Sequence, residues 1–333
     1  MNAVVLGSGG WGTALAIVLR DNGHAVTLWS RDAAKADALR QSRENPLLRG
    51  VEIPREIEIT NDLAPLRGAE LVVFAAPSFA LRSVARLAAP FLAPDALLVS
   101  VTKGIERGTH LRMSQLVREE TGGAHEIVAL SGPSHAEEVA RRLPTGCVAA
   151  SESQEAAEAV QKAFMNEAFR VYTHDDPVGV ELSGALKNVA ALCCGIVDGF
   201  GLGDNTKALL MTRALTEMAR LTEKLGGRRD TVAGLAGVGD LIVTCTSMHS
   251  RNRRAGILIG QGKTPQEATK EVGAVVEGCY AAQSAKELSD ELGVDMPICR
   301  AVYAALYEGA EVAPTVHALM SRQPKRESDS CWV

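Results

Sequence analysis

Residues 4–16, "VVLGSGGWGTALA", contain three glycines with the spacing G-x-G-x-x-G. A β-rich run at residues 3–7 leads into these glycines, a helical run from about 11 to 22 follows, and a second β-rich run covers 25–30. A glycine-rich turn between a strand and a helix predicts a dinucleotide-binding site, with the pyrophosphate at the helix N-terminus. The alternative, a glycine-rich turn without a ligand, is disfavoured by the strands and the helix around it.

Each glycine has its own role in that pattern. Gly7 permits the tight turn, Gly9 lets the pyrophosphate approach the backbone, and Gly12 allows the helix to pack closely on the sheet. At the end of the second strand, Ser30 and Arg31 precede Asp32. Arg31 can pair with a 2′-phosphate, so we expect NADP(H) to be accepted, whereas Asp32 is either the N-cap of the next helix or a ribose contact.

The rest of the first half repeats this alternation of strands and helices. Further strands are expected at residues 71–75, 97–101, 126–131, 145–150 and 169–173. Such alternation predicts a parallel, doubly wound Rossmann-type α/β sheet over residues 1–176. Helical periodicity then dominates, at 179–197, 205–225, 251–260, 280–292 and 297–308, and predicts a mainly α-helical domain over 177–322. Residues 323–333 are polar and aperiodic and are expected to form a disordered tail.

Composition excludes several classes of protein. The 333 residues carry a net charge of −5, which gives no electrostatic reason to expect a nucleic-acid partner. Seven cysteines show neither C-x-x-C spacing nor a zinc-like pairing with histidine, so no metal site is expected and reduced thiols are favoured. With no signal-like N-terminus and no apolar run long enough to span a membrane, we expect a cytoplasmic protein.

One lysine interrupts an otherwise apolar helical segment, "ELSGALKNVAALCCGI", at residues 181–196. Small residues lie three and four positions from Lys187 on both sides, so its side chain is expected to run along a shallow trough on its own helix. The trough leaves space for a ligand. The alternative is a lysine that reaches solvent from the helix edge.

Three other stretches favour a ligand site. Lys103 follows the carboxyl end of a strand, where open α/β sheets bind ligands. Asp240 lies in a glycine-rich segment, and Ser250 can cap a helix that begins with Arg251 and Asn252. Because cations are unfavourable at a helix N-terminus unless an anion binds there, this last segment predicts a phosphate site, although a solvated basic turn is also possible.

Together these segments resemble one family over nearly the whole chain, the NAD(P)-dependent sn-glycerol-3-phosphate dehydrogenases of the bacterial soluble type. The segments that carry the resemblance are "GSGGWGTALA", "TKGIE", "LSGPSHAEEVA", "ELSGALKNVAAL", "GLGDNTKALL", "GLAGVGDLIVTCTS", "SRNRRAG" and "VVEG". The resemblance implies a reversible hydride transfer between NAD(P)(H) and the pair dihydroxyacetone phosphate and sn-glycerol 3-phosphate. It also implies a supply of glycerol 3-phosphate for glycerophospholipid synthesis, and a homodimer.

The resemblance further assigns roles to individual positions. Lys187 matches the proton donor and acceptor, Lys103 contacts cofactor and substrate, and Asp240 orients Lys187 or a substrate hydroxyl. The positions matching substrate contacts are Lys103, Gly132, Ser134, Lys187, Asp240, Ser250, Arg251 and Asn252, with Asn188 and Thr244 as further contributors. The positions matching cofactor contacts are Gly10, Trp11, Arg31, Lys103, Ala136, Arg251, Val275 and Glu277, beside the three fingerprint glycines.

Two other functions are compatible with parts of this pattern. A two-domain dehydrogenase acting on a β-hydroxy acid would share the glycine fingerprint and a catalytic lysine in a helical domain. A dinucleotide-binding sensor without chemistry would need only the fingerprint, but retention of Lys187, Lys103 and Asp240 together argues against it. Cys193 and Cys194 are expected to be packing residues rather than redox sensors.

Overall fold

A computed structural model describes residues 1–324, 326 and 327 and divides into two compact units. The first unit comprises Met1–Lys103 and Leu111–Pro177, and the second comprises Gly104–His110 and the chain from Val178 onward. The short segment Gly104–His110 was expected in the first domain, but it packs with the helical unit. Of the expected tail, residue 325 and residues 328–333 lie outside the described residues.

The first unit is built on an eight-stranded sheet with the order β3-β2-β1-β4-β5-β6-β7-β8. Its strands are β1 (Asn2–Leu6), β2 (Ala25–Trp29), β3 (Glu58–Thr60), β4 (Leu71–Phe74), β5 (Leu97–Ser100), β6 (Ile127–Ser131), β7 (Thr145–Ala150) and β8 (Phe169–His174). From β1 the chain first adds strands on one side and then, at β4, on the other. This reversal is the topological switch point at which open α/β sheets bind ligands.

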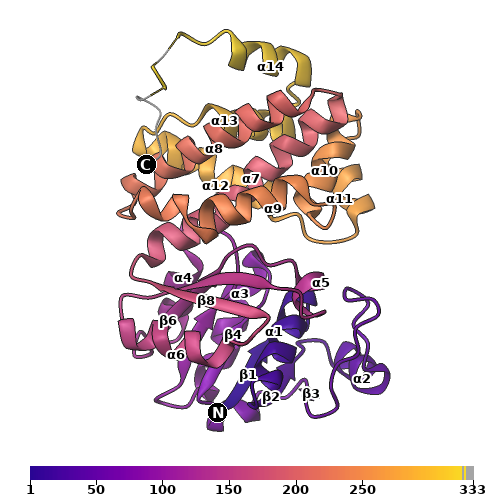
Figure 1. The fold of residues 1–333 in the computed structure, drawn as a ribbon, viewed down its shortest axis with the longest axis vertical. Helices are drawn as coiled ribbons and strands as arrows, with labels where there is room; N and C mark the ends of the chain where they lie inside the picture. The colour runs from indigo at the N-terminus through magenta and orange to yellow at the C-terminus, as the bar shows by residue number, and fades with distance from the viewer. Residues whose placement is uncertain (325, 328–333) are drawn as a thin grey trace. The chain divides into compact units, whose positions relative to one another are not determined.

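Helices cover both faces of this sheet (Figure 1). One face packs against α1 (Gly10–Asp21), α2 (Ala33–Ser42), α5 (Ala136–Val139) and α6 (Gln154–Phe164). The other face packs against α3 (Ser78–Ala88), α4 (Met113–Glu120) and the 3₁₀ turn η1 (Ala64–Gly68), with a second 3₁₀ turn, η2 (Ala89–Phe91), after α3. Successive strand residues alternate between the two cores, as Val5 and Leu6 do in β1. The prediction of a Rossmann-type doubly wound sheet is confirmed.

The sheet differs from the predicted one in two places. Strand β3 was not predicted, because its three residues are too short to show a period. The sheet is also not wholly parallel, since β7 runs antiparallel to β6 while β8 runs parallel to β7. Parallel neighbours are usually joined by a full crossover helix, but only the four-residue helix α5 lies between β6 and β7.

The second unit is helical, as predicted. Its helices are α7 (Pro177–Phe200), α8 (Asp204–Lys224), α9 (Asp240–Thr246), α10 (Arg251–Gly260), α11 (Pro265–Val272), α12 (Glu277–Leu292), α13 (Pro297–Tyr303) and α14 (Val312–Met320). Three short turns complete it: the 3₁₀ turn η3 (Asp230–Ala233) and the π-helical turns η4 (Leu235–Gly239) and η5 (Ala304–Glu308). The expected segment 297–308 is thus α-helical only as far as Tyr303. The short helices α9, α11 and α14 were not predicted.

Helix α7 forms the centre of the helical unit. It is apolar on all sides, and every residue from Gly179 to Val197 is buried. By length and composition it is the only described helix that could cross a membrane, but the whole apolar window is buried inside the unit. Such burial is typical of a core helix, and Lys187 lies in the middle of it.

Candidate functional site

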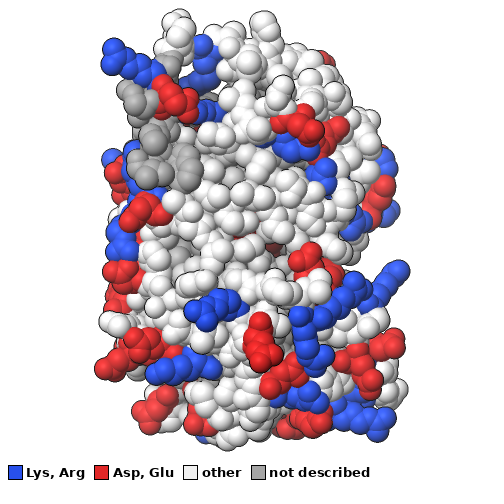
Figure 2. Space-filling view, in the orientation of Figure 1, with Lys and Arg blue, Asp and Glu red and all other residues white. Residues whose placement is uncertain are grey.

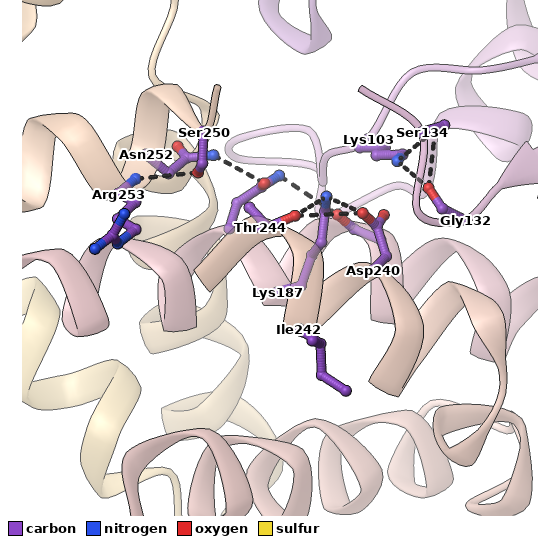
Figure 3. Close-up of polar contacts among 12 residues, drawn as sticks. Lys103, Gly132, Ser134, Lys187, Asp240, Ile242, Thr244, Ser250, Asn252 and Arg253 are labelled. Carbon is purple, nitrogen blue, oxygen red and sulfur yellow. Dashed lines mark hydrogen bonds and ion pairs between the residues drawn. The ribbon is translucent and has the colours of Figure 1, made fainter. Parts of the chain in front are cut away.

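Lys187 is buried in the helical unit and has two partners on α9. Its Nζ donates to Asp240 Oδ1 at 2.5 Å and to Thr244 Oγ1 at 2.7 Å, and the Thr244 hydroxyl lies 3.3 Å from the same Asp240 oxygen. Figure 3 shows the three side chains pointing toward one another. Only 6% of Lys187 and 1% of Asp240 are exposed. The helix therefore accepts an ammonium group because a buried carboxylate compensates its charge, and the alternative of a lysine that reaches solvent is wrong.

The sequence before α9 places Asp240 where it meets this lysine. The π-helical turn η4 leads directly into α9. At Gly237 within it, a Cβ would lie 1.9 Å from the carbonyl oxygen of Val232, so only glycine fits. Asp240 and Thr244 are four residues apart and therefore share one face of α9. A glycine-dependent turn thus directs both side chains toward Nζ.

Helix α10 begins with the predicted cap. Ser250 Oγ accepts a hydrogen bond from Arg253 N at 3.2 Å, so the prediction of Ser250 as N-cap is confirmed. Arg251 follows as an exposed first helical residue, and within the described chain its guanidinium makes no hydrogen bond or ion pair. No acidic residue lies in the first turn of α10. The start of the helix therefore offers N–H groups and an unpaired guanidinium to an anion.

Asn252 is placed differently from Arg251. Its side chain is buried, and its Nδ2 donates to Asn188 Oδ1 at 2.9 Å. Its Oδ1 accepts from the backbone N–H of Gly278 at 2.8 Å. Asn252 thus joins the residue next to Lys187 on α7 to the first turn of α12. From the sequence, Asn252 was expected only at the phosphate, and no local sequence pattern reveals this bridge.

Val275 and Glu277, two expected cofactor contacts, lie beside that bridge. Val275 and Val276 precede α12, and Glu277 is its first residue. A Cβ at Gly278 would lie 2.6 Å from the carbonyl oxygen of Asn188. Glycine at this position of "VVEG" thus lets the start of α12 contact the backbone of α7.

In the sheet unit, Lys103 reaches the turn that follows β6. Its Nζ donates to the Gly132 carbonyl oxygen at 2.9 Å and lies 3.5 Å from Ser134 Oγ, which itself donates to the Gly132 carbonyl at 2.8 Å (Figure 3). Gly132 has a φ of +150°, and a Cβ there would lie 2.9 Å from Cys147 Cα. The three expected substrate contacts of this unit therefore form one hydrogen-bonded group at the carboxyl ends of β5 and β6.

The three fingerprint glycines differ in how much space their neighbours leave for a side chain. Gly7 has a φ of +134°, and a Cβ there would lie 2.7 Å from the Ala75 carbonyl oxygen. At Gly12 a Cβ would lie 1.9 Å from the Gly7 carbonyl oxygen, so this position needs glycine for helix–strand packing. A Cβ at Gly9 would meet nothing within 4 Å. Packing therefore explains Gly7 and Gly12, while Gly9 leaves the backbone open to a ligand.

The start of α1 has the properties of an anion site. Gly9 is its N-cap, without a side-chain hydrogen bond and without an acidic residue in the first turn. Trp11 Nε1 is buried and has no hydrogen-bond partner among the described residues. Gly10 lies against Ala136 of α5, with an added Cβ 3.6 Å from the alanine Cβ. These residues fit a bound dinucleotide. The first N–H groups of α1 have no side-chain cap, and no neighbouring atom lies within 4 Å of a Cβ built at Gly9.

Arg31 is exposed directly after β2, and its Nη1 lies 3.5 Å from Ser83 Oγ. Asp32 is the N-cap of α2 and accepts from Lys35 N at 3.1 Å. Of the two roles left open for Asp32, that of N-cap is confirmed. A ribose contact by Asp32 stays a prediction.

The cysteines agree with a packing role. Cys193 and Cys194 are buried in the core of the helical unit, and burial raises the pKa of the Cys193 thiol well above its ordinary value. A hydrogen bond with Cys194, followed by burial, raises the pKa of Cys245 as well. Such thiols stay protonated and are poor nucleophiles. Cys331 lies outside the described residues.

The face of the molecule in Figure 2 carries acidic and basic side chains side by side rather than a patch of one sign. Among the residues that the structure describes, no group of three or more His, Cys, Asp or Glu side chains could hold a metal ion.

Comparison with protein families matches both units. The N-terminal model of NAD-dependent glycerol-3-phosphate dehydrogenase matches residues 2–157, and the C-terminal model of the same family matches residues 176–317. A glycerol-3-phosphate dehydrogenase [NAD(P)+] of Moorella thermoacetica is 52% identical over 328 residues, covering 98% of this chain and 97% of the relative. That of Clostridium perfringens (strain SM101) is 49% identical over 324 residues, covering 97% and 98%.

Solved structures agree with these relatives. The crystal structure of glycerol-3-phosphate dehydrogenase from Coxiella burnetii has a TM-score of 0.92 and 36% identity, covering 96% of this chain and 99% of that one. The Saccharomyces cerevisiae enzyme has a TM-score of 0.81 and 27% identity, covering 95% and 98%. The resemblance stated from the sequence motifs is therefore confirmed.

Proposed function

The chain belongs to the NAD-dependent glycerol-3-phosphate dehydrogenase family, and from that premise we propose how its residues share the chemistry. The reaction is the interconversion of dihydroxyacetone phosphate and sn-glycerol 3-phosphate with NAD(P)(H). The assignment of catalytic roles rests on the buried contact of Lys187 with Asp240 and Thr244. The alternatives of a β-hydroxy acid dehydrogenase and of a sensor without chemistry are wrong, because the matched relatives are glycerol-3-phosphate dehydrogenases.

Lys187 is the proton donor in the direction of ketone reduction. When bound, NAD(P)H supplies the hydride that reduces the C2 carbonyl carbon, and negative charge then grows on the carbonyl oxygen. The Lys187 ammonium gives that oxygen a proton, and in the reverse direction the neutral amine takes the proton back. Asp240 and Thr244 hold Nζ in one place, so no reorientation of the lysine is needed during transfer.

The substrate phosphate binds at the start of α10. Arg251 and the first N–H groups of the helix contact its oxygens, and Ser250 and Asn252 hold that turn in place. Binding energy from this remote group positions the carbonyl for reaction. Lys103, Gly132 and Ser134 are assigned as further substrate contacts, and so is Asn188, the residue next to Lys187.

The sheet unit carries the residues assigned to the pyrophosphate and to the 2′-phosphate of the cofactor. Gly9 and the α1 N-terminus receive the pyrophosphate, Trp11 and Ala136 line the same region, and Arg31 pairs with the 2′-phosphate of NADP(H). Val275, Glu277, Lys103 and Arg251 are assigned as further cofactor contacts. In the cell the enzyme acts in the cytoplasm as a homodimer and supplies glycerol 3-phosphate for glycerophospholipid synthesis.

The reaction is tested by following the absorbance of reduced nicotinamide with purified protein and dihydroxyacetone phosphate, with NADH and NADPH in parallel. We expect oxidation of the cofactor that requires the phosphorylated ketone and yields sn-glycerol 3-phosphate, with activity on NADPH as well as NADH. This function would be rejected if the cofactor is oxidised equally fast without the ketone. It would also be rejected if neither NADH nor NADPH is oxidised.

A further inference from the structure

Asp198, close to the end of α7, holds two cations. Its Oδ2 accepts from Arg253 Nη2 at 2.7 Å and from Arg253 Nε at 2.9 Å. Its Oδ1 lies 2.7 Å from Lys207 Nζ on α8. The three side chains are only 13–16% exposed. Solvent therefore screens this cluster little, and Asp198 compensates the charge of Arg253, while Lys207 is also 3.3 Å from Asp204 Oδ1.

Arg253 uses its remaining donor group on the loop before α10. Its Nη1 donates to the Thr246 carbonyl oxygen at 3.1 Å and lies 2.9 Å from Met248 Sδ. Thr246 is the last residue of α9, and residues 247–250 form the loop that joins this helix, which carries Thr244, to the helix that begins with Arg251. The guanidinium thus fixes the connection between the residues around Lys187 and the start of α10.

Four glycines bring α7 and α10 into backbone contact. A Cβ at Gly195 would lie 2.2 Å from the Arg253 carbonyl oxygen, and one at Gly199 would lie 2.1 Å from that of Ile257. From the other helix, a Cβ at Gly256 would lie 2.2 Å from the carbonyl oxygen of Leu192, and one at Gly260 would lie 2.1 Å from that of Ile196. Helices in such close contact cannot slide past each other without a clash. The register of α10 against α7 is therefore fixed.

These contacts connect the helix that carries the proposed proton donor to the helix that carries the proposed phosphate ligand. Lys187 and Asn188 lie on α7, Arg251 lies at the start of α10, and the Asn188–Asn252 hydrogen bond links the helices near both. The guanidinium of Arg253 is already paired with Asp198. Of Arg251 and Arg253, only Arg251 is therefore left to bind the substrate phosphate.

We propose that Asp198 and Arg253 are positioning residues that set the span between the Lys187 ammonium and the phosphate-binding start of α10. This inference rests on the proposed function, since it takes Lys187 as proton donor and Arg251 as phosphate ligand. In dihydroxyacetone phosphate one methylene and one ester oxygen separate the carbonyl carbon from phosphorus. A fixed span therefore makes the phosphate place that carbonyl at the lysine, and a loosened span loses this advantage.

The test compares dihydroxyacetone phosphate with unphosphorylated dihydroxyacetone, which makes no use of α10. We expect Asp198→Asn and Arg253→Lys to lower kcat/KM for the phosphorylated ketone at least about tenfold, with a fall in kcat as well as a rise in KM. Activity on high concentrations of dihydroxyacetone, and NADH binding, should stay within about twofold of the wild type. Arg300→Lys is the control for the same exchange in a more exposed arginine–aspartate pair, because Arg300 lies 2.6 Å from Asp290, and it should change the kinetics with neither ketone.

Other outcomes are decisive as well. Equal losses on the two ketones would show a merely structural ion pair and would overturn the inference, as would unchanged kinetics with the phosphorylated ketone. If Asp198→Asn does not fold, Arg253→Lys keeps the positive charge and carries the same expectation. Wild-type protein that turns over neither ketone would instead reject the proposed function, so the two failures can be told apart.

Discussion

Lys187 and Asp240 form a buried ion pair, with Nζ and Oδ1 2.5 Å apart, although 53 residues separate them in the chain. The pair lies between the central helix α7 and the short helix α9, and Thr244 completes it from the same helix as Asp240. A buried cation without this carboxylate would be strongly unfavourable. The position of the lysine amine thus depends on α9 and on the glycine-rich turn before it.

Gly9→Ala should leave the fold intact and weaken cofactor binding. A Cβ at this position meets nothing within 4 Å, and the φ of −72° suits alanine, so we expect a change in unfolding free energy within about 0.5 kcal/mol. The methyl group would instead stand where the pyrophosphate approaches. Titration of NADPH fluorescence should show a Kd raised at least about tenfold.

Gly12→Ala is the contrasting variant. Its Cβ would lie 1.9 Å from the Gly7 carbonyl oxygen, so the helix must move away from the strand, and overpacking of this kind costs about 1–3 kcal/mol. Thermal unfolding should show a clear loss for Gly12→Ala and almost none for Gly9→Ala. Equal losses of stability in the two variants would remove the distinction between a ligand-facing and a packing glycine.

Arg31→Ala should change the preference between cofactors. The side chain is exposed after β2 and carries no ion pair within the described chain, so its removal costs little stability. We expect KM for NADPH to rise by about tenfold, as for the loss of one charge-assisted phosphate contact, and KM for NADH to change much less. Similar changes in the two KM values would show that Arg31 does not read the 2′-phosphate.

Glu217 should make stability depend on pH. Burial raises the pKa of this carboxyl to about 7, although its oxygens accept from the backbone N–H groups of Ile298 and Cys299 at 2.7 and 3.1 Å. Since the pKa in the folded state lies above that of the unfolded chain, the folded state holds the proton more tightly. Stability from this group is fully present below the ordinary pKa of about 4.5 and is lost as pH rises through about 7.

The measurement is thermal unfolding of Glu217→Gln and the wild type at several pH values. Because one pKa unit corresponds to ~1.4 kcal/mol, the wild type should lose on the order of 3 kcal/mol relative to the variant between pH 4.5 and 7.5. The exposed Glu308→Gln serves as control and should follow the wild type. A constant difference in Tm between Glu217→Gln and the wild type across this range would contradict the raised pKa.

The sequence predicted the elements with strong local signals. The fingerprint glycines, the β-rich runs and the long helices have periods that a single chain reveals, and Ser250 was identified as a cap because capping is local. The direction of β7 and the three-residue strand β3 depend on pairing between strands, which composition does not encode. The segment Gly104–His110 lies between strands in the sequence, but it packs with the helical unit through buried Ile105 and the pair His110–Glu287.

In the candidate site, too, the sequence does not reveal which residues of different helices are in contact. Lys187 was conspicuous in the sequence because an apolar helix surrounds it, but its contact with Asp240 depends on how α9 packs against α7. Arg251 and Asn252 are neighbours in the sequence with similar expected roles, yet Arg251 is exposed and Asn252 is buried between α7 and α12. Which side of a helix its neighbours cover is a tertiary property, and only the structure separates the two residues.

The most direct test of the account is the turnover of Lys187→Ala at saturating dihydroxyacetone phosphate, with NADPH binding measured on the same protein. Loss of the proton donor should lower kcat by about 10²-fold or more, while NADPH binds as in the wild type and the exposed control Lys224→Ala keeps full activity. A kcat for Lys187→Ala close to that of the wild type would contradict the role of Lys187 and with it the proposed mechanism.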